Sequence, residues 1–108
     1  MRGVMGGLEP SVSAGIHIHS GYTCDDSDGV GGHYWDESGN GPWGSTDPWT
    51  TNYVSNAQGF AVVDMSMDDF SLDMSYPTAY RTMVVHSSDA KIGWYVGRVG
   101  MRCAGLRW

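Results

Sequence analysis

The chain has 108 residues, 41% of them hydrophobic, and twelve acidic against six basic side chains give a formal net charge of −6. This length fits a single domain over residues 1–108. The acidic balance argues against nucleic acid as a partner, because phosphate recognition needs clustered Lys and Arg. The charge and the lack of a long apolar run also argue against a membrane partner.

Turn residues recur every few positions, and no apolar period of helical type is sustained, which predicts an all-β fold. Strands are expected at residues 2–8, 14–20, 49–54, 59–66, 79–86 and 94–104. The second and third of these are separated by one long loop, residues 21–48, rich in Gly, Asp and Ser. Its aromatic side chains favour an ordered loop, and ordered loops of this length are usually functional.

The chain contains four histidines, all at positions where a sheet and one loop could bring them together. His17 and His19 are two residues apart in an expected strand, so both imidazoles project from the same face. His33 follows two glycines in the long loop, and His86 ends an apolar strand. Each has an ordinary structural interpretation when taken singly: an exposed strand pair, a solvated loop histidine, a strand-end histidine. The set as a whole predicts a metal site, and nitrogen ligands without a thiolate favour copper over zinc.

Two cysteines, Cys24 and Cys103, lie far apart in the sequence. An even count permits one long-range disulfide. Two separate buried thiols fit the spacing equally well.

Four blocks of the sequence resemble the copper/zinc superoxide dismutase family. Residues 15–19 (GIHIH) resemble the family's copper-binding strand, Cys24 its loop cysteine, residues 31–34 (GGHY) its bridging-histidine block, and residues 81–86 (RTMVVH) its last copper-binding strand. Order and approximate spacing agree, and the likeness extends from Gly15 to Cys103.

The resemblance implies a Greek-key β-barrel or sandwich of the superoxide dismutase type. It implies a copper ion held by four histidines: His17, His19, His33 and His86. It also implies a disulfide between Cys24 and Cys103, and with it an extracellular or other oxidising compartment.

The departures from the family pattern are informative. Residues 34–50 contain no histidine, so the family's zinc ligands are missing and no zinc is expected. The charged loop before the second cysteine is shortened to residues 87–102. Both losses resemble the copper-only branch, which includes extracellular fungal enzymes and superoxide dismutase-like repeat proteins. The family's first two strands are also missing, which suggests a fragment, strands supplied by a partner, or neighbouring repeat domains.

Two roles remain to be filled by residues of this chain. The family's anion-guiding arginine falls here on Gly100. A bulge could re-aim either Arg98 or Arg102 to replace it, and Arg98 is favoured. Without zinc, the second ring nitrogen of His33 needs another partner, and Asp47 is proposed for it. Its rivals are two other loop acids, Asp36 and Glu37. Tyr34 and Trp35 are expected to wall the site.

Two functions are therefore expected from the sequence. The first is an enzyme, a copper-only superoxide dismutase that converts superoxide anion to oxygen and hydrogen peroxide with Arg98 and His33 in catalytic roles. The second is a non-catalytic module that binds copper or serves as an extracellular structural unit.

Overall fold

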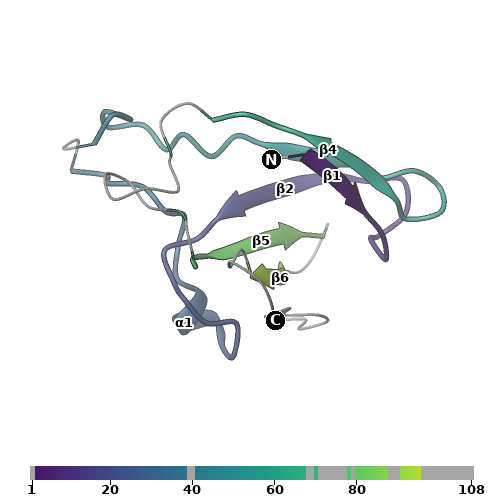
Figure 1. Ribbon diagram of the computed structural model, residues 1–108, viewed down its shortest axis with the longest axis horizontal. Coiled ribbons are helices and arrows are strands. Elements are labelled where there is room, and N and C mark those ends of the chain that lie inside the picture. The colour runs from purple at the N-terminus through teal and green to yellow at the C-terminus, as the bar shows by residue number, and fades with distance from the viewer. Residues whose placement is uncertain are drawn as a thin grey trace.

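The computed structural model describes residues 2–38, 41–67, 70, 78, 80–87 and 91–95. Within these residues the protein is mostly antiparallel β-strands in two sheets, with one four-residue helix (Figure 1). The all-β class expected from the sequence is confirmed. Closure into a Greek-key barrel of the superoxide dismutase type stays a prediction.

The smaller sheet pairs the first strand with the fourth. Strand β1 (Arg2–Met5) runs antiparallel to β4 (Ala61–Asp64), and Val4 lies opposite Val62. The burial of β4 alternates, with Ala61 and Val63 inside, as the period-2 geometry of a strand requires. Val4 and Val62 face outward and are 71% and 77% exposed.

The larger sheet has the order β3-β2-β5-β6. Strand β2 (Ser13–Ile18) lies between β3 (Asn52–Val54) and β5 (Thr82–His86), and β6 (Lys91–Tyr95) pairs with β5. The start of β2 pairs with β3, and its end pairs with β5. The end of β2, which carries the histidine pair, is thus held against the strand that ends in His86.

The core contains residues from both sheets. Its buried members are Leu8, Ala14, Ile16, Tyr53, Ala61, Val63 and Val85. In Figure 1 strands β1 and β4 lie along one side of the molecule, and β2, β5 and β6 lie along the other. Burying this apolar surface is what fixes the two sheets relative to each other.

Several expected boundaries were wrong. The strand expected at 49–54 begins only at Asn52, because the preceding residues turn to contact the loop that carries His33. The strand expected at 79–86 begins only at Thr82, because Tyr80 has a φ of 66°, outside the strand region. The strand expected at 94–104 begins earlier, at Lys91, and its residues after Tyr95 lie outside the described part of the chain.

The long loop contains a short helix that the sequence analysis did not predict, α1 (Ser27–Val30). The carboxylate of Asp26 accepts a hydrogen bond from the backbone nitrogen of Gly29 at 2.6 Å, as an N-cap residue does. The capping residue was present in the sequence, but the helix has no apolar period to reveal it.

Candidate metal centre

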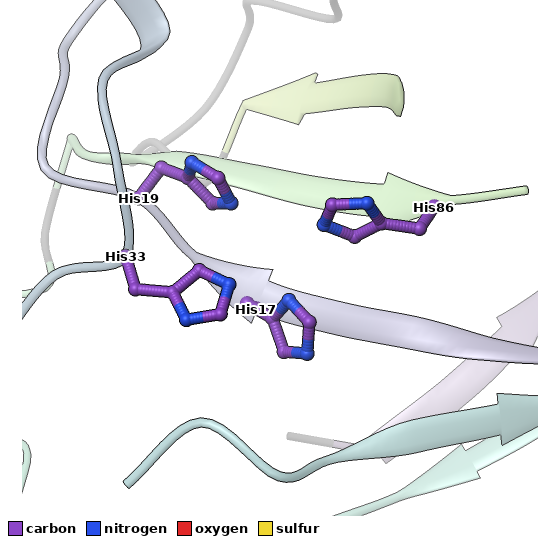
Figure 2. A group of neighbouring side chains, drawn as sticks. All are labelled: His17, His19, His33 and His86. Carbon is purple, nitrogen blue, oxygen red and sulfur yellow. The ribbon is translucent and has the colours of Figure 1, made fainter. Parts of the chain in front are cut away.

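The four histidines come from three segments of the chain (Figure 2). His17 lies in β2 and His19 directly follows it, while His86 is the last residue of β5. His33 comes from the long loop, which returns to the end of β2 and forms an isolated antiparallel bridge between His19 and His33. The loop therefore completes a set of ligands that the sheet alone leaves one short.

Backbone hydrogen bonds hold the returning loop in place. The amide of Tyr34 donates to the carbonyl of Ile18 at 2.9 Å, and the amide of Ser20 donates to that of Gly32 at 2.8 Å. Gly31 has a φ of 71°, a left-handed conformation that glycine adopts without steric cost. This glycine lets the chain turn back so that His33 faces the sheet.

The imidazoles converge on one point (Figure 2). One ring nitrogen from each of His17, His19, His33 and His86 lies within 4.8 Å of the others. Metal–imidazole bonds are about 2.0 Å long, so nitrogens on one ion are at most about 4 Å apart. The widest separation in the set therefore exceeds this limit by less than about 1 Å. The four histidines lie close together and could bind a metal ion.

The side chain of His19 is held by the long loop that follows β2. Its Nδ1 lies 2.7 Å from the carbonyl oxygen of Gly31, and the residue is only 2% exposed. A carbonyl oxygen can only accept, so this geometry places the proton on Nδ1. The lone pair of Nε2 is then available to a metal.

His33 is held by Asp47, the acid that the sequence analysis favoured for this position. Nδ1 of His33 lies 2.7 Å from Oδ2 of Asp47, and Oδ1 of Asp47 accepts a hydrogen bond from the amide of Trp49 at 2.8 Å. The rival Asp36 instead accepts a hydrogen bond from the backbone nitrogen of Ser38 within its own turn. Asp47 can therefore keep the proton of His33 on Nδ1 and leave Nε2 for a metal.

A cluster of aromatic rings lies beside the histidines. Trp49 is buried, its ring centroid is 6.3 Å from that of His17, and its Nε1 donates to the carbonyl of Tyr34 at 2.8 Å. Tyr34 is part of this cluster, and the aromatic ring next to His17 is that of Trp49. That Tyr34 and Trp35 wall the site stays a prediction. The cluster is completed by Trp43 and Phe70, stacked at 5.1 Å. The sequence analysis missed Phe70, because nothing in its local sequence indicates a contact with a loop far away.

The imidazole of His17 has a strongly lowered pKa. Its pKa is lowered from 6.5 to about 4, first by burial and then by the neighbouring His33, His86 and His19, against the opposing effect of Asp47. Its Nδ1 is buried and has no hydrogen-bond partner. A neutral imidazole with an unsatisfied buried nitrogen is suited to bind a cation.

The titration of His17 gives a testable prediction for the metal-free protein. We expect its imidazole to titrate near pH 4, against 6.5 when unfolded. Since the unfolded state binds the proton more tightly, this residue favours folding above pH 6.5 and loses that contribution as the pH falls to about 4. NMR of the ring carbons gives the midpoint, and urea unfolding of the wild type and His17→Gln across this window gives the stability difference. A midpoint near 6.5 would contradict the prediction.

Three further predicted residues cannot be placed at the site. Arg98, Arg102 and Cys103 lie outside the described residues. Cys24 is buried in the long loop at 4% exposure. The disulfide and the guiding arginine therefore stay predictions.

In the comparisons with known proteins, no family model matches this chain, and no curated protein matches it. Among the described residues, no helix has the length and hydropathy needed to cross a membrane.

Proposed function

We propose that this chain binds one copper ion through its four histidines and acts as a copper-only superoxide dismutase. One observation carries the proposal: imidazole nitrogens from His17, His19, His33 and His86 converge, and no carboxylate or thiolate belongs to the set found in the described residues. An all-nitrogen set of this kind favours copper among the common divalent ions.

The donor groups fit copper in their protonation states as well. His17 is neutral at physiological pH and has a buried, unsatisfied Nδ1. His19 and His33 each have Nδ1 engaged by an oxygen at 2.7 Å, which leaves Nε2 to bind the ion. The zinc histidines of the family have no counterpart here, because residues 34–50 contain no histidine.

When bound, copper would supply one-electron redox chemistry between Cu(II) and Cu(I), by which two superoxide anions and two protons become one oxygen and one hydrogen peroxide. The chain's own residues hold the ligands in place during this cycle. Asp47 retains the proton on Nδ1 of His33, so that this nitrogen does not rotate toward the ion or exchange its role with Nε2. The buried Trp49 beside His17 excludes water from that side of the site.

Superoxide is an anion, and the net charge of −6 repels it from the molecule as a whole. A local positive charge is therefore required at the site. We propose Arg98 for this role, as expected from the sequence. From the resemblance to the copper/zinc superoxide dismutase family we also propose a disulfide between Cys24 and Cys103. The same resemblance leads us to propose an extracellular or other oxidising location. Partner strands or neighbouring repeat domains are proposed to cover the edges of the sheets.

Replacing Asp47 with asparagine tests the contact to His33. We expect Asp47→Asn to lower copper affinity by roughly tenfold, because removing the outer partner of a ligating histidine typically costs 10–100-fold. Competition with a chelator of known copper affinity measures the loss. The matched control is Glu37→Gln, a loop acid that is exposed and should bind copper as the wild type does. Equal affinities in the two variants would contradict the role given to Asp47.

The proposal as a whole is tested by loading the protein with copper and measuring superoxide decay. We expect one copper per chain and a decay rate that depends on it. His86→Ala removes one ligand and should lose both the bound copper and the activity. A wild-type protein that binds no copper would refute the proposal.

A second function is favoured by two specific observations. The position of the family's arginine is occupied by Gly100, and Val4 and Val62 form an exposed apolar pair on the outer face of the β1–β4 sheet. Both fit a copper-binding or structural module without catalysis, whose outer face contacts another domain. Copper bound at full stoichiometry without superoxide decay would select this alternative.

A further inference from the structure

Arg81 lies immediately before β5 and reaches across the end of β2. Its Nη1 donates a hydrogen bond to the carbonyl oxygen of Ser20 at 2.5 Å. Its guanidinium carbon lies 3.6 Å from the ring centroid of Tyr34 and 4.8 Å from that of Tyr22. The side chain that precedes β5 thus contacts both the segment leaving β2 and the segment returning to it.

We propose that Arg81 is a positioning residue for His33 in the metal centre. The inference rests on the proposed metal site and adds to it a residue that acts on His33 through the neighbouring Tyr34. Tyr34 follows His33 in the chain, and its amide donates to the carbonyl of Ile18 at 2.9 Å. The guanidinium on the Tyr34 ring therefore fixes the residue that sets where the His33 backbone lies.

The chemistry of these contacts requires arginine in particular. A guanidinium is flat, so it can lie against an aromatic ring while its in-plane N–H groups donate to a carbonyl oxygen. The ammonium group of lysine is a point charge and cannot make both contacts in the same way. Within the described residues, the loop that carries His33 has no long regular element, so its position depends on individual contacts. The contact with Arg81 adds to the backbone hydrogen bonds at Ile18 and Gly32 and to the contact of His33 with Asp47.

The first experiment uses the metal-free protein and does not depend on copper. We expect Arg81→Met and Arg81→Lys to speed amide hydrogen exchange at Tyr34 by at least tenfold. The amide of Ile16, which donates to the carbonyl of Thr51 on the far side of β2, should exchange at the wild-type rate. Unchanged exchange at Tyr34 would overturn the proposal, and so would equal acceleration at Ile16, which would indicate general destabilisation.

The second experiment is a double-mutant cycle measured as copper(II) affinity. We expect Arg81→Met to weaken copper binding about tenfold in the wild-type background, but to have little effect when His33→Gln is already present. The control is Arg2→Met, which removes an exposed ion pair with Asp64 on the β1–β4 sheet and should leave the affinity unchanged. The same tenfold loss in both backgrounds would overturn the proposal, because Arg81 would then not act through His33.

The two experiments separate this inference from the proposed function. If the wild type binds no copper, the metal centre fails, and a positioning role toward a metal fails with it even where Tyr34 exchange is accelerated. If the wild type binds copper and the cycle shows no coupling, the metal centre stands and the role of Arg81 alone is refuted. Coupling together with selective acceleration at Tyr34 supports both.

Discussion

Gly15→Ala is expected to weaken copper binding about 100-fold while leaving the free energy of unfolding almost unchanged. Gly15 is two residues before His17, so a side chain added at position 15 would project from the same face of β2. A Cβ at position 15 would lie 2.3 Å from Cε1 and 2.8 Å from Nε2 of His17. The imidazole would have to swing away. Disturbing the orientation of a ligating histidine typically costs 10–100-fold in metal affinity, and displacing the ring itself is expected to reach the upper end of that range.

The fold should tolerate Gly15→Ala because the collision involves only the end of a flexible side chain. Gly15 lies in a strand, with no left-handed backbone conformation to lose. Alanine at such a position commonly stabilises a protein slightly, by restricting the unfolded chain. Urea unfolding and chelator competition on the same samples measure the two quantities separately.

The matched control for this prediction is Gly3→Ala in β1. A Cβ there would meet no atom within 4 Å, so neither stability nor copper affinity should fall. If Gly15→Ala bound copper as tightly as Gly3→Ala, the position of the His17 ring in the metal centre would be wrong. If Gly15→Ala unfolded readily, the added Cβ would be displacing the backbone as well as the His17 side chain.

Gly21→Ala is expected to lower the free energy of unfolding by about 3 kcal/mol, near the upper end for an overpacked site. A Cβ on Gly21 would lie 1.8 Å from the carbonyl oxygen of Gly29 and 2.6 Å from that of Val30. These are backbone atoms, and the Gly21 amide itself donates to the carbonyl of Val30 at 2.9 Å. The carbonyl of Gly21 accepts a hydrogen bond from the Thr82 amide at 2.9 Å. Both backbone groups of Gly21 are therefore hydrogen-bonded.

The collision at Gly21 should also reach the metal centre. Relieving it separates α1 from the end of β2, and the segment after α1 is the one that carries His33. We therefore expect Gly21→Ala to lose copper affinity together with stability, in contrast to Gly15→Ala. The midpoint of urea unfolding should fall with little change in the slope, as for a folded state that is destabilised without becoming less compact.

Gly32→Ala is the control for this second prediction. Gly32 is in the same loop, but an added Cβ would meet no atom within 4 Å. The free energy of unfolding of Gly32→Ala should match that of the wild type within about 0.5 kcal/mol, as for most surface substitutions. A loss at Gly32 equal to that at Gly21 would show that the loop tolerates no side chain at either position, and the close approach of Gly21 to α1 would not be the cause.

The sequence by itself predicted the all-β class and the four histidines that converge. Strand periodicity places His17 and His19 on one face without any tertiary information, since alternate residues of a strand must project together. The apolar run before His86 likewise identifies a buried strand. These strand features depend on contacts within a few residues, which a sequence records directly. That all four histidines meet was expected from the set as a whole and from the family resemblance.

Other features were decided only by the tertiary structure. Three acids in the long loop were candidates to hold His33, and the fold brings Asp47 to it through the contacts of Trp49 with Asp47 and Tyr34. Arg81 is 61 residues from Ser20, the carbonyl it binds. A loop without periodicity can be closed in many ways at similar local cost, so its final path depends on which distant side chains it packs against, and those contacts exist only once the sheets have formed.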